Sequence, residues 1–405
     1  MVTSPDNQFV GGLDNVNEAW FDAMIRHQIG LLRVSGAVRN RILSVLDATE
    51  SDIREQITIR LGASRSVSRQ RALIAAITAI RSEAWRQSAE IWREELLQIV
   101  QQEPEFMANA MRTVAPVQLD LALPSPQLLR SIVTTRPFEG RVLREWAADI
   151  RRADLRRIES AIRIGIVQGE PANVIARRVV GTVRQQGRDG VTEISRRQAQ
   201  AITRTAINSY TNQAKREFYQ VNSDILTEEL YVATLDSRTT PICRSLDGQR
   251  FPIGRGPIPP LHFNCRSLRV ASLDGEAFGR RPQRQFTQQQ LLREYSRAQG
   301  FRAPSRRADL PRGHKGPFDD FSRQRIRELT GTIDAKVTYQ QWLGRQSREF
   351  QADVLGNTRA RLFRDGNLAL PRFVNRRGDE FPLSELARRE ADAFRAAGLN
   401  PDDFT

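Results

Sequence analysis

Cysteine, histidine and lysine are scarce in this sequence of 405 residues. The two cysteines, Cys243 and Cys265, argue against a secreted scaffold stapled by several disulfides. The longest apolar run, residues 72–80, is far below the roughly 18 residues that cross a bilayer, so we expect no membrane contact. The first dozen residues lack the basic and apolar regions of a secretory signal, which favours assembly in the cytoplasm.

Nucleotide-binding glycine motifs are missing as well. The sequence contains neither the GxxxxGK[ST] loop that cradles phosphates nor the GxGxxG turn of dinucleotide-binding folds. A motor driven by nucleotide hydrolysis is therefore excluded.

Positive charge, by contrast, is abundant and comes almost wholly from arginine. Only three of the 62 basic residues are lysines, and the formal net charge is +15. Arginine binds phosphate through a planar, two-pronged guanidinium, so the excess favours contact with nucleic acid or with an acidic protein surface. Codon bias would explain the ratio of arginine to lysine, but not the excess of positive over negative charge.

The charge is concentrated in two stretches. Residues 131–220 carry 17 basic and 9 acidic residues, and residues 280–312 carry 9 basic and 2 acidic ones. The second stretch also contains helix-breaking prolines, which indicates an exposed basic linker. A solvated helix face explains the arginines of the first stretch as well as DNA contact does. The candidate contacts to DNA phosphates are Arg151, Arg152, Arg156, Arg157, Arg280, Arg281, Arg306 and Arg307.

Hydrophobic periodicity predicts a protein made mainly of helices. Apolar residues recur at spacings of three and four over long segments, which is typical of helices with one buried face. We expect Pro104 to end the second helix and Ser195 to cap the fifth. The expected helices cover residues 14–61, 67–102, 137–168, 171–180 and 195–221.

The central stretch, residues 231–270, has a different pattern. Residues 230–235 alternate with a period of two, and residues 267–272 form another short apolar run, which indicates strands. Between them, residues 243–253 resemble a hairpin that turns at Asp247-Gly248. We therefore predict a mainly α (α+β) fold, in which a bundle of long helices carries a small antiparallel β-sheet.

A short helical tail is expected after the basic linker. Its candidate N-caps are Thr338, Ser347, Thr358 and Ser384. The expected regions are an N-terminal helical region at 1–136, a core at 137–275, the basic linker at 276–317 and the tail at 318–405.

Three residues of the central stretch are of the types that bind zinc: Cys243, His262 and Cys265. His262 and Cys265 are close in sequence, and the hairpin would bring Cys243 to them. A fourth ligand is missing, although Asp236 or Asp247 could supply it at an unusual spacing. Three alternatives stay open: two reduced thiols packed in the sheet, a disulfide between the cysteines, or a zinc site.

A catalytic role is a weaker hypothesis. Cys243 and His262 would form a nucleophile and a base, and His262, Asn264 and Asp247 would mimic part of a metal-dependent nuclease site. A second metal-binding histidine is lacking, because the other two histidines lie in distant segments. We therefore expect neither enzyme activity nor a required cofactor.

The central motif combines a D-x-x-T-x-x-x-C-x-x-x-D-G run with a later P-P-x-H-x-N-C-R run. This order and spacing resemble the core of the Mu F-type minor head proteins of tailed phages, also called phage head morphogenesis proteins. The likeness covers about residues 137–272, including the helix around 201–208, and a looser one covers residues 338–366. The motif residues are Asp236, Thr239, Cys243, Asp247, Gly248, His262, Asn264, Cys265 and Arg266.

Two positions depart from the family pattern. Thr240 and Ser267 stand where family members often have cysteine, so a site of four thiolates is excluded. The resemblance then implies either a core that needs no metal, or a site in which His262 and an aspartate replace the missing thiolates.

The resemblance implies a structural virion protein inside the head, near the portal, that influences head assembly and the packaging or delivery of DNA after assembly in the host cytoplasm. The implied partners are the portal, the major capsid protein and packaged double-stranded DNA. No base-reading motif is evident, so DNA contact would be independent of sequence. A stand-alone DNA-binding protein is the alternative, and a nuclease centred on His262 a weaker one.

Overall fold

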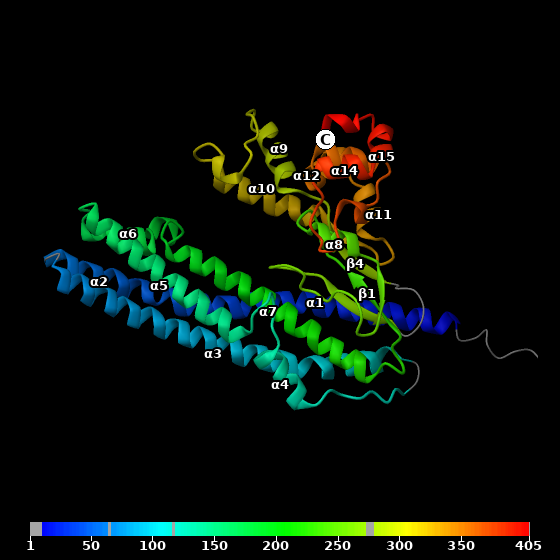
Figure 1. Cartoon of the computed structure of the whole chain (residues 1–405), viewed down its shortest axis with the longest axis horizontal. Coiled ribbons are helices and arrows are strands. Elements are labelled where there is room, and N and C mark those ends of the chain that lie inside the picture. Colours follow the sequence, from blue (N-terminus) through cyan, green and yellow to red (C-terminus); the bar gives the residue numbers. More distant parts are fainter. Residues whose placement is uncertain (1–9, 64–65, 116–117, 273–278, 405) are drawn as a thin grey trace, which may run out of the picture.

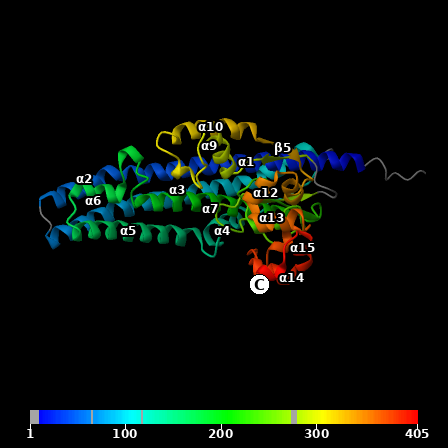
Figure 2. The ribbon, with the colours of Figure 1, turned by 90° about the horizontal axis from the view of Figure 1, so that it is seen from above.

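The computed structural model describes residues 10–63, 66–115, 118–272 and 279–404. Long helices dominate it and form an elongated bundle, as Figures 1 and 2 show. This confirms the prediction of a mainly α fold. The bundle contains α1 (Val10–Asp47), α2 (Thr49–Ala63), α3 (Val67–Val114), α5 (Leu143–Val167) and α7 (Thr192–Val221), with the shorter α4 (Pro126–Thr135), α6 (Ala172–Val180) and η2 (Val183–Gln185).

The helix α3 is longer than the sequence predicted. We expected it to end at Pro104, but it continues to Val114 with the proline inside it. The extra turns bury Met107 and Met111 in one apolar cluster with Trp20 of α1. Burial of each such side chain contributes about 1.5–3 kcal/mol, which offsets the roughly 3 kcal/mol that an interior proline costs.

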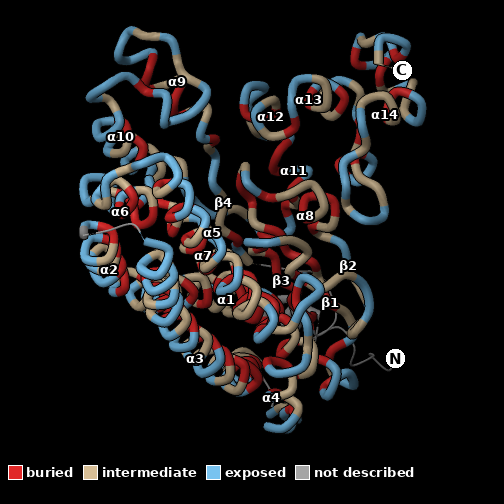
Figure 3. Tube along the Cα trace, turned by 60° about the vertical axis from the view of Figure 1, so that its left-hand side comes forward, coloured by how far each residue is buried: buried red, intermediate tan, exposed pale blue. Residues whose placement is uncertain are grey.

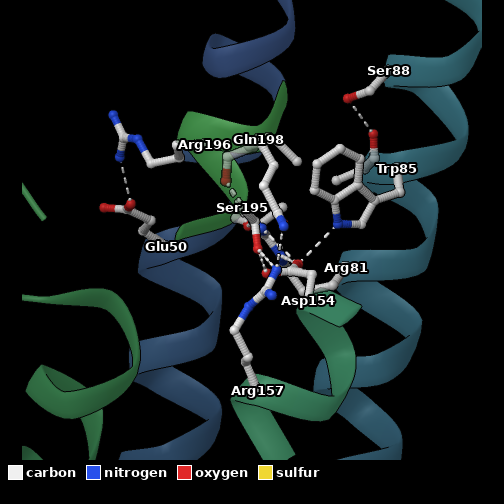
Figure 4. Close-up of polar contacts among 12 residues, drawn as sticks. Glu50, Arg81, Trp85, Ser88, Asp154, Arg157, Ser195, Arg196 and Gln198 are labelled. Atoms are coloured by element: carbon white, nitrogen blue, oxygen red, sulfur yellow. Dashed lines mark hydrogen bonds and ion pairs between the residues drawn. The ribbon is translucent and has the colours of Figure 1, made fainter. Parts of the chain in front are cut away.

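A buried polar cluster joins α2, α3, α5 and α7 inside the bundle (Figure 4). Asp154 accepts hydrogen bonds from Arg81 Nε at 2.9 Å, from Trp85 Nε1 at 2.8 Å and from Ser195 Oγ at 2.5 Å. Arg81 also donates to Thr49 at the start of α2. The Arg81 and Asp154 side chains are 1% and 0% exposed, so this ion pair is shielded from water. We call Arg81, Trp85, Asp154 and Ser195 the Asp154 hub.

The predicted small antiparallel sheet is present, with three strands in the order β2-β1-β3. The central strand β1 (Glu228–Val232) pairs with β2 (Arg250–Pro252) on one side and with β3 (Leu268–Ser272) on the other. Trp20 of α1 donates a hydrogen bond from Nε1 to the carbonyl oxygen of Ala271 at 2.9 Å. The sheet is therefore held directly against the helical bundle.

The hairpin that we expected at residues 243–253 is wrong. The short helix α8 (Pro241–Leu246) replaces its first strand, with Pro241 in the first turn, where the missing N–H of proline costs little. Asp247 ends this helix, and Gly248 follows with a φ of +82°. The turn at Asp247-Gly248 thus exists, but it connects a helix to β2 rather than two strands.

The described part of the expected linker, residues 279–317, is folded. β4 (Arg280–Arg284) pairs with β5 (Thr330–Asp334), and residues 276–278 lie outside the described residues. The elements α9 (Gln288–Ala298), η3 (Arg307–Asp309) and α10 (Lys315–Glu328) follow β4. The expectation of an exposed connection fails because a small apolar core lies under the arginines: Leu291, Leu292, Tyr295, Leu310 and Phe318. The boundaries of the four expected regions stay predictions.

The C-terminal helices enclose an apolar core that also contains Leu235 of the central stretch, and Figure 3 shows buried residues along these helices. Two of the expected N-caps, Thr338 and Ser347, are confirmed. Thr358 and Ser384 are not N-caps, because each is the second residue of its helix. None of the described helices has the length and apolar character of a membrane span. The elements are α11 (Tyr339–Gly344), α12 (Arg348–Leu355), α13 (Asn357–Arg364), η4 (Leu370–Phe373), α14 (Leu383–Arg389), α15 (Ala391–Ala396) and η5 (Pro401–Phe404).

Candidate metal centre

The two cysteines and the central histidine lie close together. Cys243 comes from α8, whereas His262 and Cys265 come from the loop between β2 and β3. The Sγ atoms of the two cysteines are 3.8 Å apart, and Cys243 Sγ lies 3.3 Å from His262 Nε2. Both cysteines are buried and His262 is half-buried. We call these three residues the Cys–His cluster.

Both thiols are free, because a separation of 3.8 Å is well beyond the roughly 2.05 Å of a disulfide bond. The disulfide alternative therefore does not describe this structure. Reduced thiols and a metal site remain, and both are compatible with the positions of the three side chains.

The pKa values of the two thiols are shifted in opposite directions. The contact with Cys265, followed by contacts with His262, Ser267 and Tyr231, lowers the pKa of Cys243 below its ordinary value. The contact with Cys243, together with burial, raises the pKa of Cys265. Burial lowers the pKa of His262, but the hydrogen bond and charge of Cys243 raise it overall. Negative charge thus concentrates on Cys243, beside the imidazole.

Two further contacts fix the orientation of the cluster. The Nδ1 atom of His262 lies 2.9 Å from the carbonyl oxygen of Phe263, so this nitrogen carries the proton and Nε2 faces the sulfur. Tyr231 of β1 donates a hydrogen bond from its hydroxyl to Cys243 Sγ at 3.3 Å. Neither contact was expected from the sequence, although the position of Tyr231 in a predicted strand next to the motif was a usable signal.

The helix α7 holds the loop between β2 and β3 through hydrogen bonds. Thr205 Oγ1 accepts a hydrogen bond from the backbone N–H of Asn264 at 3.0 Å, and Arg204 donates to the Asn264 side chain at 2.8 Å. One turn further on, the side-chain amide of Asn208 donates to the carbonyl oxygen of Cys265 at 3.1 Å. Asn264 adopts a φ of +61°, which asparagine tolerates better than most residues. Its role here is therefore to shape the loop.

Asp247, one of the two aspartates suggested as a fourth ligand, is occupied elsewhere. Its carboxylate accepts hydrogen bonds from the backbone N–H groups of Ala233 and Tyr339, both at 2.6 Å. Arg281 of β4 pairs with the same carboxylate at 2.9 Å, and both side chains are buried. Asp247 therefore connects the central motif to the C-terminal elements, and sequence reasoning missed its two partners Arg281 and Tyr339.

Asp236, the other suggested ligand, is also engaged. Arg266 donates to both of its carboxylate oxygens, at 2.5 and 2.9 Å. Burial alone would raise the pKa of Asp236, but the hydrogen bond and charge of Arg266 lower it below its ordinary value. Thr239 donates to the same carboxylate at 3.2 Å. Asp236 and Arg266 thus form a structural ion pair beside the Cys–His cluster, and Thr239 adds a hydrogen bond to it.

The candidate DNA-contact arginines differ in how far they are exposed. Arg281 is buried in its ion pair with Asp247, so its assignment to the DNA-contacting surface is wrong. Arg157 donates to Ser195 at 2.8 Å and to Gln198 at 2.9 Å, and it therefore supports the Asp154 hub (Figure 4). The side chains that stay on the exposed surface are Arg151, Arg152, Arg156, Arg280, Arg306 and Arg307.

Comparison with known families finds one match in this part of the chain. Residues 156–269 match the family model described as phage Mu protein F like protein. This segment runs from the middle of α5 through α7 and the Cys–His cluster to the start of β3. Searches of curated proteins and of solved structures found no match. The resemblance noted in the sequence is confirmed over residues 156–269, which are similar to the phage Mu protein F like family.

Proposed function

We propose that this chain is a structural minor head protein of a tailed phage, which lies inside the head near the portal and acts in head morphogenesis and in DNA packaging or ejection. The observation that carries the proposal is the family match over residues 156–269. The net charge of +15 also supports it, because a protein beside packed DNA gains from guanidinium groups that neutralise phosphates. The proposed protein partners are the portal and the major capsid protein.

Chemical cross-linking of purified heads, followed by mass spectrometry, tests this proposal. We expect cross-links from this chain to the portal and to the inner surface of the major capsid protein. Heads assembled without the portal are the matched control, and the first set of cross-links should disappear from them. Infectious heads that wholly lack the chain at every assembly stage would contradict the proposal.

A group of arginines beside the Cys–His cluster supports contact with the DNA backbone. Burial, and then the charges of Arg39, Arg238 and Arg266, lower the pKa of Arg204. Arg284 adds its charge to the surroundings of Arg238. The Arg238 side chain lies 3.5 Å from Asp236 but is 67% exposed, so part of this group of arginines faces solvent. Such a surface attracts phosphates without reading the base sequence.

Charge reversal tests the DNA contact. We expect the double change Arg238→Glu and Arg284→Glu to reduce the slope of log affinity against log salt by about 2 for duplex DNA. The triple change Arg151→Glu, Arg152→Glu and Arg156→Glu tests the face predicted from the sequence. The change Arg163→Glu on the same helix, at an arginine that is not among the candidate DNA contacts, is the control.

The outcomes of this titration also separate the two candidate functions. Retention that is unchanged in both multiple variants would contradict a DNA contact at these surfaces. Strong salt-dependent binding by a chain that never associates with heads would favour the second candidate, a stand-alone DNA-binding protein.

We propose that the role is structural rather than catalytic. Two residues that a nuclease at His262 would need, Asp247 and Asn264, have structural partners in Arg281 and Arg204. Incubation of the purified chain with DNA and divalent metals should give no cleavage. Cleavage that disappears in a His262→Ala variant of normal stability would overturn this part of the proposal.

A further inference from the structure

The spacing of the Cys–His cluster suits one tetrahedral metal ion. Two sulfurs that each lie about 2.3 Å from zinc are about 3.8 Å apart at the tetrahedral angle, and the two Sγ atoms are 3.8 Å apart. A sulfur and an imidazole nitrogen on the same ion are about 3.6 Å apart, against 3.3 Å between Cys243 Sγ and His262 Nε2. All three donor atoms lie within 4.8 Å of one another. One ion can therefore contact them with small side-chain shifts.

The surroundings of the cluster are those of a metal site. Ligating histidines usually donate their second ring N–H to a carbonyl or carboxylate, and His262 Nδ1 has this contact with Phe263 at 2.9 Å. The Tyr231 hydroxyl donates to Cys243 Sγ, which stabilises a thiolate. The contacts with Phe263 and Tyr231 thus fix the orientation of His262 and Cys243 without a bound ion.

We propose that Cys243, His262 and Cys265 bind one zinc ion and leave its fourth coordination position to an exchangeable ligand such as water. Two thiolates and an imidazole favour zinc over magnesium or calcium, which prefer oxygen ligands. Within the described ranges, no further cysteine, histidine or carboxylate joins this group. The ion pairs of Asp236 and Asp247 explain why neither aspartate completes it. This inference goes beyond the proposed head function and does not depend on it.

The cluster lies close to an exposed stretch of the loop between β2 and β3. Cys243 and Cys265 are buried, but Phe263 and Asn264 on the same loop are exposed and His262 is half-buried. Under the proposal, the fourth position lies beside this exposed stretch and is open to water and small anions. A closed structural site with four protein ligands would not offer this access.

Metal analysis of the full-length chain tests the proposal. We expect the purified protein to hold about one zinc ion per chain, and the change Cys265→Ser or His262→Ala to reduce this content at least tenfold. His314→Ala is the matched control, because His314 contacts Tyr295 and does not belong to the cluster, and it should retain the ion. A chain without bound metal after incubation with zinc, whether its thiols are both reactive or joined in a disulfide, would overturn the proposal.

Cobalt substitution in the unaltered chain covers the case in which the variants fail to fold. We expect the charge-transfer absorption of two thiolates together with the intense visible bands of tetrahedral cobalt. Azide should change this spectrum by replacing water at the fourth position. Weak octahedral bands without thiolate absorption would identify an adventitious ion and overturn the proposal. A tetrahedral spectrum that azide does not change would contradict an exchangeable ligand at the fourth position.

The hydrogen bond from Tyr231 to Cys243 allows a test in which zinc binding is weakened but not abolished. Loss of an outer-shell hydrogen bond typically lowers metal affinity about 10-fold to 100-fold, so Tyr231→Phe should weaken zinc binding by this factor. The phenylalanine keeps the buried ring in place and removes only the hydroxyl. An unchanged affinity would contradict the assignment of Tyr231 as a partner of a zinc-bound thiolate.

Discussion

The Asp154 hub and the Cys–His cluster are both buried polar groups within reach of α7, but they are completed in different ways. In the hub, the carboxylate of Asp154 is surrounded by Arg81, Trp85 and Ser195, so its charge and its hydrogen-bonding capacity are satisfied by protein alone. In the cluster, Cys243 Sγ lies 3.8 Å from Cys265 Sγ and 3.3 Å from His262 Nε2, so three groups of metal-binding type face one another. The first arrangement fixes helices, whereas the second brings together donor atoms that are close enough to hold one metal ion.

The largest expected effect comes from opening the hub. Asp154→Ala leaves Arg81 buried without its partner, and breaking such a pair costs about 3–5 kcal/mol of folding free energy. Urea unfolding followed by circular dichroism would measure it. Glu159→Ala on the same helix removes an exposed pair with Arg163 and should cost less than about 1 kcal/mol. Equal losses of folding free energy in the two variants would show that the buried hub contributes no more than an exposed ion pair.

The second change acts on the Asp247 pair, which lies next to the cluster. Asp247→Asn removes the charge that Arg281 and the N–H of Tyr339 share, and we expect a loss of about 3 kcal/mol. Hydrogen exchange should rise first in β4 and α11 and only later in the bundle. A uniform rise across the whole chain would contradict a local linking role.

Removal of metal is the third test, and it distinguishes the cluster from the hub. If zinc is present at about 100 times its dissociation constant, a strong chelator should lower the free energy of unfolding by about 2–3 kcal/mol. The loss should be absent in Cys265→Ser. A chelator effect of the same size in both proteins would mean that the ion is bound elsewhere.

The smallest effect is a dependence on pH at Asp236. The pKa of this carboxyl is lowered in the folded chain from its ordinary value of 3.8, so its ion pair stabilises the fold fully above that value. This stabilisation is lost as the pH falls through the lower, folded pKa. Acid unfolding curves of the unaltered chain should therefore decline more steeply below pH 3.8 than those of Asp236→Asn. Parallel curves would contradict the pairing with Arg266.

Much of the fold could be predicted from local patterns. The long helices, the three strands and the caps Thr338 and Ser347 follow from periodicity and from the chemistry of serine and threonine at helix starts. Prediction failed where contacts distant in sequence outweigh local preference. The cap expectation for Ser195 is wrong because α7 starts at Thr192, and the serine lies inside the helix, where its hydroxyl binds Asp154.

The candidate site was predicted in its residues but not in its connections. The motif brought Cys243, His262 and Cys265 together as expected, although a helix and not a hairpin carries Cys243. The partners of Asp247 could not be found from spacing, because Arg281 looked like one of many surface arginines. Charge patterns alone do not separate an arginine that neutralises a buried carboxylate from one that faces solvent.

The ion pair between Asp247 and Arg281 also limits how the chain can be divided. The segment that matches the family, residues 156–269, contains the carboxylate, but its counter-ion lies twelve residues beyond the end of the match. A fragment cut at that point would keep a buried negative charge and lose the guanidinium that neutralises it. The shortest piece that folds independently should therefore extend at least through β4, and a limit drawn from sequence similarity alone falls short of it.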